Sequence, residues 1–158
     1  MVSILIFLWI AFILLFLSYV ARRFVHKSIL YPFNNWDTID TPYITLNIQG
    51  HDFNMIVDSG ASVSIIRRDF IKNLNYELSP RVIKMIALTD DGVNSDTITV
   101  PINVNGNEIK NDFVIYDGSD IANFEVKHGI TIHGILGVEF FRNTGGIVDF
   151  TNKTVKFP

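Results

Sequence analysis

The chain contains no cysteine among its 158 residues. This absence excludes disulfide bonds, thiol catalysis and cysteine-based zinc sites, and it leaves the redox compartment of the protein open. The formal net charge at pH 7 is only −3, and the sequence has no basic stripe with interleaved aromatic residues. Such a mild charge gives no support for nucleic acid or any other strongly charged partner.

The sequence also lacks a recognisable metal-binding motif. His128 and His133 stand near Glu125 and Glu139. Their spacing matches neither the helix motif of zinc peptidases nor a zinc finger. We therefore expect a protein that uses no metal and no cofactor.

One long hydrophobic run opens the chain. Residues 2–21 include no charged side chain, and a helix of about twenty residues crosses a hydrocarbon layer of about 30 Å. A cleaved signal peptide is the alternative. It is disfavoured because no Lys or Arg precedes the run, the run exceeds the usual apolar core of about 7–15 residues, and the residues before Arg22 form a poor cleavage site. The sequence therefore predicts a transmembrane helix over residues 1–21.

Cations after the run indicate its orientation in the membrane. Arg22, Arg23 and Lys27 all follow the run, and positively charged flanks favour the cytoplasmic side. We predict a single-pass membrane protein held in the lipid bilayer by its N-terminus. Residues 22–41 are then a juxtamembrane linker, and residues 42–158 form a cytoplasmic domain.

The remainder of the chain has the pattern of short β-strands separated by turns. Apolar and polar residues alternate over 43–48, and a β-rich run over 53–57 follows a turn at Gly50-His51. Asn105-Gly106 is a strong two-residue turn signal. Further strands are expected over residues 82–88, 97–104, 108–116 and 147–157, and helices only over residues 65–74 and 138–142. Many short strands with regular turns indicate an all-β barrel or sandwich.

The segment with the clearest chemical content surrounds Asp58. Residues 55–66 read MIVDSGASVSII, so that an apolar strand ends in a carboxylate. Gly60 permits a tight turn and brings its N–H close to the carboxylate, because no Cβ intervenes. Ser59 can donate a hydrogen bond to the neighbouring backbone and fix the loop.

This segment resembles the active-site signature of aspartic proteases: apolar residues, Asp, Thr or Ser, Gly, Ala or Ser, and alternating apolar positions. Far downstream the sequence also has Ile135, Leu136 and Gly137. In aspartic protease domains two apolar residues and a glycine pass beneath the catalytic loop and precede a short helix. The resemblance covers about residues 43–158. It implies the small closed β-barrel of the retropepsin-like acid proteases, with one short helix.

The mechanism implied by the resemblance needs two carboxylates that share one proton. One is ionised and activates water, and the other is protonated and polarises the scissile carbonyl. The chain has one such loop, and residues 149–151 lack the glycine required for a second. We therefore expect a homodimer in which the two copies of Asp58 meet at a two-fold axis.

The expected function is that of an aspartic endopeptidase acting on peptide or protein substrates. Asp58 is the catalytic acid and base, and the loop around it is completed by Ser59, Gly60, Ala61 and Ser62. One alternative is a catalytically inactive dimerisation or peptide-binding module on the same fold. Another is a small membrane-tethered β-domain in which Asp-Ser-Gly is only a common turn.

The resemblance also implies a flap, a hairpin that closes over the bound peptide and excludes water. The candidate tip consists of Thr89, Asp90, Asp91 and Gly92, with Gly92 as its flexible point. Retroviral flaps are rich in glycine, whereas this tip has two aspartates. A plain solvated turn is therefore the alternative interpretation.

Overall fold

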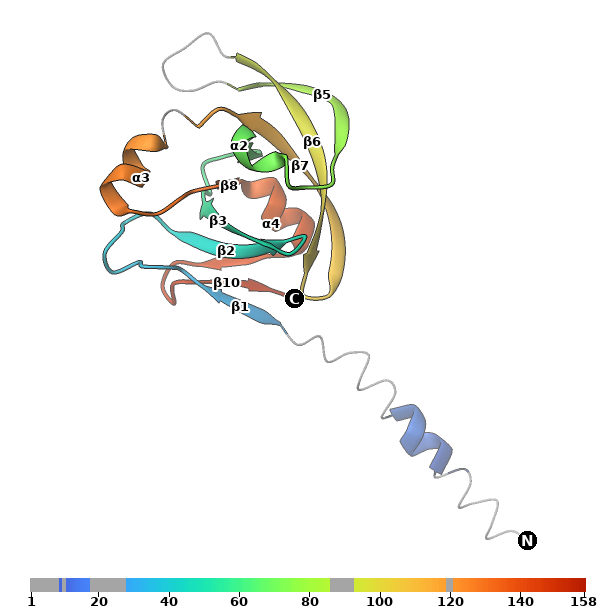
Figure 1. The fold of residues 1–158 in the computed structure, drawn as a ribbon. Coiled ribbons are helices and arrows are strands. Elements are labelled where there is room, and N and C mark those ends of the chain that lie inside the picture. The colour runs from blue at the N-terminus through green and yellow to red at the C-terminus, as the bar shows by residue number, and fades with distance from the viewer. Residues whose placement is uncertain (1–8, 10, 18–27, 86–92, 119–120) are drawn as a thin grey trace, which may run out of the picture.

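The computed structural model describes residues 9, 11–17, 28–85, 93–118 and 121–158 (Figure 1). The chain is mostly β with a few short helices. The strands are β1 Ile29–Pro32, β2 Tyr43–Ile48, β3 His51–Val57, β4 Ser64–Arg67, β5 Glu77–Met85, β6 Val93–Val104, β7 Asn107–Tyr116, β8 Gly134–Leu136, β9 Ile147–Asp149 and β10 Thr154–Phe157. The helices within the domain are α2 Arg68–Ile71, α3 Ala122–His128 and α4 Val138–Thr144.

The strands form two sheets. The larger sheet has seven strands in the order β2-β3-β8-β4-β7-β6-β5, and the smaller sheet has the order β1-β10-β9. Most neighbours are antiparallel, but β3 pairs with β8 and β4 pairs with β7 in parallel. The short strand β8 therefore lies between two strands that flank the Asp58 loop.

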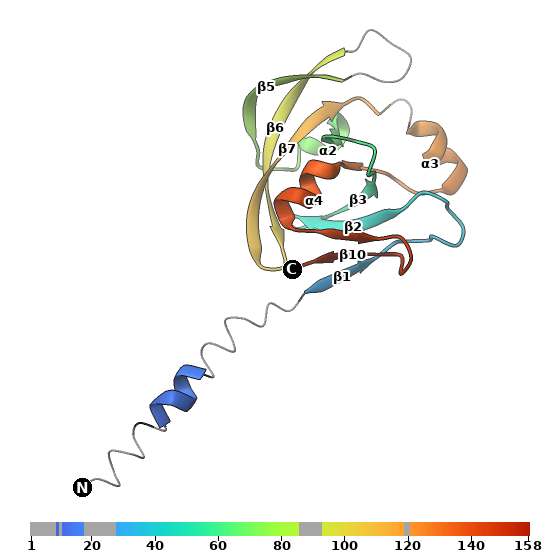
Figure 2. The ribbon, with the colours of Figure 1, turned by 180° about the vertical axis from the view of Figure 1, so that it is seen from behind.

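The strand pairing does not form the closed barrel that we predicted. Among the described residues, β2 and β5 are the two ends of the larger sheet and have no ladder between them. The β5–β6 hairpin extends beyond the body of the domain in both views (Figures 1 and 2). The first and last strands pair with each other in the separate sheet, so they do not bridge the open edges.

The hydrophobic core lies between the two sheets and α4. The alternating residues Ile44 and Leu46 of β2 and Met55 and Val57 of β3 are at most 3% exposed, and Phe140 of α4 is fully buried. Burial of each such side chain stabilises the fold by about 1.5–3 kcal/mol. The core face of β3 therefore fixes the strand that leads into Asp58.

The segment before β2 is part of the folded domain. β1 pairs with β10 in antiparallel register, with Ile29 opposite Phe157. Phe33 and Ile39 are 6% and 4% exposed. We predicted that residues 22–41 are a linker, but residues 29–41 pack on the domain. Sequence pattern missed β1 because its side chains do not alternate in burial and its partner is at the other end of the chain.

The predicted hairpins are confirmed in most respects. Both residues of the Asn105-Gly106 turn have positive φ, 54° and 79°, as a tight hairpin turn requires. The first turn is centred on Gln49-Gly50, with φ of 54° and 88°, one residue earlier than predicted. The β5–β6 hairpin is present. Its tip, with Thr89, Asp90, Asp91 and Gly92, lies outside the described residues.

The helix predictions are only partly correct. The helix expected over residues 138–142 is confirmed as α4. The helix expected over residues 65–74 is wrong for its first half, where Ser64–Arg67 form β4, and only Arg68–Ile71 are helical. The reason is that β4 has strand partners on both sides, β8 and β7, which local sequence does not reveal. α3 was not predicted.

The N-terminal hydrophobic run is described only at residue 9 and residues 11–17, which are helical. Their large apolar side chains are 45–69% exposed. Within the described residues, no helix combines the length and the hydropathy needed to cross a membrane. Most of the predicted transmembrane helix, residues 1–21, lies outside the described residues.

Candidate active site

The Asp58 loop connects two strands that both border β8. β3 ends at Val57 and β4 begins at Ser64, so residues 58–63 form the connection. Val57 is paired in parallel with Leu136, and Ile65 is paired in antiparallel register with Ile135. The β8 strand therefore passes directly between the two arms of the loop.

Two main-chain hydrogen bonds fix the loop against β8 and the segment that follows it. The Asp58 N–H donates to the Leu136 carbonyl at 3.1 Å, and the Val138 N–H donates to the Ala61 carbonyl at 2.8 Å. Within the loop the Ala61 N–H also donates to the Asp58 carbonyl at 3.3 Å. Each such bond contributes about 1 kcal/mol. The loop is therefore tied at its start and in its middle.

The Asp58 carboxylate is oriented by the loop itself. Its Oδ1 accepts a hydrogen bond from the Gly60 N–H at 2.8 Å. A Cβ on Gly60 would stand 3.2 Å from that oxygen, closer than most Cβ contacts. Asp58 is half-buried, whereas Ser59, Gly60 and Ser62 are exposed. A carboxylate held in this way can take a proton from a water molecule or a substrate group that reaches it.

The far end of the loop is closed by side chains that the sequence did not identify. Ser64 is fully buried, and its Oγ accepts a hydrogen bond from the Gly137 N–H at 2.9 Å. The Ser64 N–H donates to Glu139 Oε1 at 2.6 Å. The sequence pattern assigns no role to Ser64, and it presents Glu139 only near two histidines whose spacing fits no metal-binding motif. No local sequence signal reveals the contact between Ser64 and Glu139, because the two residues are 75 positions apart.

The two faces of β3 have different environments. Met55 and Val57 point into the main core, whereas Ile56 packs against a second cluster. That cluster contains the buried residues Ile39, Tyr43, Ile121 and Ile132, with Phe124 of α3 packed beside them. α3 therefore covers the face of β3 on which Ile56 lies.

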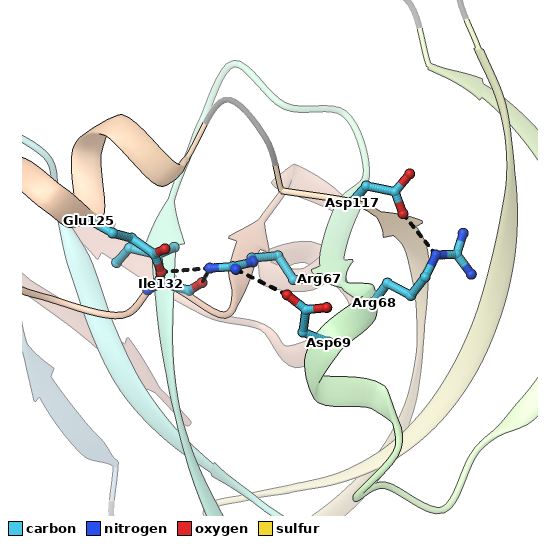
Figure 3. Close-up of polar contacts among 6 residues, drawn as sticks. All are labelled: Arg67, Arg68, Asp69, Asp117, Glu125 and Ile132. Atoms are coloured by element: carbon cyan, nitrogen blue, oxygen red, sulfur yellow. Dashed lines mark hydrogen bonds and ion pairs between the residues drawn. The ribbon is translucent and has the colours of Figure 1, made fainter.

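An ion-pair network holds α3 to β4 and α2 (Figure 3). Arg67 Nη1 contacts Glu125 Oε1 at 2.6 Å and also donates to the Ile132 carbonyl at 3.0 Å. The same Glu125 oxygen accepts the Ile132 N–H at 2.8 Å. The Arg67 side chain is only 12% exposed, and its guanidinium also lies 5.0 Å from the Phe70 ring centre. One side chain therefore joins three elements near the loop.

Replacing Glu125 by alanine should destabilise the domain by about 2 kcal/mol. The change removes the nearer carboxylate from the Arg67 guanidinium, which keeps only Asp69 at 3.3 Å, and it leaves the Ile132 N–H without its acceptor. Chemical denaturation measures the effect. Arg68→Ala is the matched control, because it removes the exposed ion pair with Asp117, drawn in the same view, and should leave stability unchanged. Equal stability of the two variants would contradict this assignment.

His133 is held as a neutral acceptor between two aromatic rings. Its Nδ1 accepts the Asn54 N–H at 3.0 Å, and its ring lies 5.0 Å from Phe53 and 4.3 Å from Phe70, between centroids. Burial, and then the charge of Arg67, lower the pKa of His133 below its ordinary value of 6.5. Protonation would also remove the acceptor for the Asn54 N–H.

This environment predicts a pH dependence of stability. Between the lowered pKa and 6.5, the unfolded chain binds a proton at His133 that the folded chain does not. Stability is therefore full above pH 6.5 and falls with pH until the folded-state pKa is passed. His133→Gln should weaken this loss between pH 7 and pH 5 in thermal denaturation, whereas His128→Gln should not. A wild-type slope in His133→Gln would contradict the prediction.

The structure brings together most of the residues selected from sequence. Asp58 and the loop residues Ser59, Gly60, Ala61 and Ser62 adjoin Ile135, Leu136 and Gly137. A shallow depression of about 350 Å³ opens beside the loop and is lined by Ser59, Gly60, Ala61, Ser62, Val138, Glu139 and Arg142. The flap candidates lie outside the described residues, so their position relative to Asp58 is not described.

Comparisons with known proteins agree with this geometry. A family model described as aspartyl protease matches residues 44–140. The comparison with curated proteins gives no match. The chain is similar to the crystal structure of a retropepsin-like aspartic protease from Rickettsia conorii, with a TM-score of 0.54 and 16% identity over 83% of this chain and 89% of that chain. This likeness shows the retropepsin-like fold.

Two further solved structures give lower scores. One is EIAV protease complexed with the inhibitor HBY-793, with 17% identity, 70% of this chain and 94% of that chain covered, and a TM-score of 0.47. The other is the retroviral protease-like domain of Ddi1 from Leishmania major. It has 17% identity, 77% of this chain and 95% of that chain covered, and a TM-score of 0.46.

Proposed function

Since the chain belongs to the aspartyl protease family, we propose that it is an aspartic endopeptidase whose active site forms between two copies of the chain. The observation that carries the proposal is the Asp58 carboxylate, oriented by the Gly60 N–H on a loop that is tied to β8. The fold and the family match support a protease-type function, and the dimer and its paired carboxylates are the finer part of the proposal.

The proposed chemistry needs two carboxylates at the axis. One Asp58 is ionised and takes a proton from a water molecule, whose oxygen attacks the carbonyl carbon of the peptide bond. The other Asp58 is protonated and donates a hydrogen bond to the carbonyl oxygen as negative charge develops there. Collapse of the tetrahedral intermediate breaks the C–N bond, and a proton passes from the pair to the leaving amine. Two carboxyl groups in direct contact share one proton, because both cannot ionise readily.

The described residues offer a reason to seek the second carboxylate in another copy. Asp149 is the aspartate of residues 149–151, the segment that lacks the glycine needed for a second loop of the Asp58 type. Its two carboxylate oxygens accept hydrogen bonds from the Asn152 N–H at 2.8 Å and the Asn152 side-chain amide at 2.7 Å. The first of these bonds chiefly lowers the pKa of Asp149. Asp149 is engaged in the β9–β10 turn, so a second Asp58 is the simpler partner.

Enzyme dilution tests the proposal. The full-length protein, in detergent, is incubated with a peptide library over a range of enzyme concentrations, and sedimentation gives its oligomeric state. We expect cleavage whose specific activity falls as the dimer dissociates. Constant specific activity in a fully monomeric sample would overturn the dimeric site. Peptide binding without cleavage would favour the alternative, an inactive peptide-binding module.

We also propose that residues 1–21 anchor the protein in a lipid bilayer, with the protease domain in the cytoplasm. The exposed apolar side chains of Trp9 and of residues 12–17 support the anchor, and the cations that follow the run support the orientation. Alkaline carbonate extraction of membranes, followed by protease protection, tests both parts. Release by carbonate would rule out the anchor.

The tip of the β5–β6 hairpin remains the proposed flap, with Thr89, Asp90, Asp91 and Gly92 as its residues. The support is the hairpin itself, in which β5 and β6 pair up to Met85 opposite Val93. Because the chain has no cysteine, Gly92→Cys gives a unique site for a fluorophore. The fluorescence should change when a peptide that binds the protein is added. An unchanged signal at saturating peptide would argue against a flap.

A further inference from the structure

We infer that Glu139 is a positioning residue that holds the loop of the proposed Asp58 site from below. The inference rests on the proposed function for its catalytic consequence, but its structural part stands on contacts within one chain. Glu139 is the second residue of α4, which begins directly after Gly137. Its carboxylate therefore lies close to the point at which the chain passes from β8 into α4, next to the start of β4.

The Glu139 carboxylate is one of three groups that form hydrogen bonds to the C-terminal half of the Asp58 loop and to Ser64, the residue after it. Oε1 accepts the Ser64 N–H at 2.6 Å, while Ser64 Oγ accepts the Gly137 N–H at 2.9 Å. The Ala61 carbonyl is held by the Val138 N–H at 2.8 Å. Three consecutive residues after β8 thus bond to the loop or to the residue that ends it. Hydrogen bonds to a charged acceptor are about twice as strong as neutral ones, so Glu139 supplies the strongest member of the set.

The Glu139 carboxylate packs closely against Gly137, with no room for a larger residue at that position. A Cβ on Gly137 would stand 2.6 Å from Glu139 Oε2 and 2.6 Å from both the carbonyl carbon and the carbonyl oxygen of Val63. Only glycine therefore leaves room for the carboxylate beside the loop backbone. Gly137 thus has two functions: it leaves room for the Glu139 side chain, and its N–H donates to Ser64 Oγ.

The second carboxylate oxygen indicates that stability is not the main effect of this residue. Glu139 Oε2 is buried and has no hydrogen-bond partner within the part of the chain described. Burying an unpaired polar oxygen is unfavourable, which offsets much of the gain from the Ser64 contact. The remaining consequence of the contact is geometric: it fixes where β4 begins and hence the end of the Asp58 loop.

Three substitutions separate positioning from simple support of the fold. In Glu139→Gln the amide oxygen can still accept the Ser64 N–H. In Glu139→Asp the charge remains, but the side chain is one methylene too short for the contact. In Glu139→Ala both are lost. Gln49→Ala is the control, because it removes hydrogen bonds to Asn75 and Pro101 in another part of the domain.

The experiment measures kcat and KM separately for the full-length variants, together with their melting temperatures. We expect kcat to fall about 100-fold in Glu139→Ala and Glu139→Asp, with KM within about threefold of wild type, since small misplacements of catalytic groups have effects of this size. Glu139→Gln should restore kcat to within about threefold. Gln49→Ala should lower the melting temperature and leave kcat unchanged. Wild-type kcat in both Glu139→Ala and Glu139→Asp would overturn the inference.

Amide hydrogen exchange gives a readout that does not depend on activity. The Ser64 N–H should be protected in wild type and Glu139→Gln and should exchange at least about tenfold faster in Glu139→Asp. If the wild-type protein cleaves no peptide, the proposed function fails, and this exchange pattern still decides the positioning role. Equal protection of Ser64 in all variants would overturn that role whatever the activity.

Discussion

Replacing Asp58 by asparagine is expected to lower kcat/KM for peptide cleavage by at least about 1,000-fold. The amide can neither take a proton from water nor share one with the second subunit. The fold should be unaffected, because the asparagine oxygen can still accept the Gly60 N–H that Asp58 Oδ1 accepts at 2.8 Å. Loss of activity with an unchanged melting temperature would therefore report chemistry rather than unfolding.

The matched control for this variant lies on the same strand. Asp52→Asn makes the same chemical change at the exposed start of β3, where the Asp52 carboxylate accepts a hydrogen bond from the Asn47 side chain. It should retain wild-type kcat/KM. Cleavage that survives Asp58→Asn would remove Asp58 from the proposed mechanism.

Replacing Gly134 by alanine is expected to cost about 3 kcal/mol or more of the free energy of unfolding. The new Cβ would meet the Ile65 carbonyl oxygen and would stand 2.9 Å from Met55 Cε. The methionine can move, but the carbonyl belongs to β4, which is held between β8 and β7. The strand beneath the Asp58 loop must therefore shift, and cleavage should fall with stability.

Gly129→Ala separates steric overlap from backbone strain. Gly129 ends α3 with φ of 65°, and a Cβ there would have no atom within 4 Å. Its cost should be only the strain of a left-handed alanine, about 1 kcal/mol. Chemical denaturation of both variants tests the difference. If Gly134→Ala were as stable as Gly129→Ala, the tight packing of β8 beneath the loop would be refuted.

Local sequence signals predicted the parts of the fold that local interactions determine. Alternating residues in β2 and the Asn105-Gly106 turn require only neighbouring residues for their interpretation, and both are found. β1 and β4 escaped prediction because their strand character comes from distant partners. β1 pairs with the last strand, and β4 pairs with β7 and β8. The closed barrel was wrong because sheet closure depends on how distant edges meet.

The candidate site was only partly accessible from sequence for a similar reason. Asp58 and Gly60 are neighbours in the chain, so the turn between them could be interpreted directly. Family resemblance pointed to Ile135, Leu136 and Gly137, and the strand pairing places them beside the loop. The bonds of Glu139 to Ser64 and of Arg67 to Glu125 join residues 75 and 58 positions apart. Side-chain contacts over such separations leave no periodic pattern.

Mixing subunits tests most directly the claim that two chains form one active site. Wild-type protein is allowed to exchange subunits with an equal amount of Asp58→Asn protein, well above the concentration at which the dimer dissociates. If each site needs both copies of Asp58, only dimers of two wild-type chains cleave, and about one quarter of the activity of an all-wild-type sample at the same total concentration remains. About one half of that activity would remain if each chain acted alone, and that result would contradict the account.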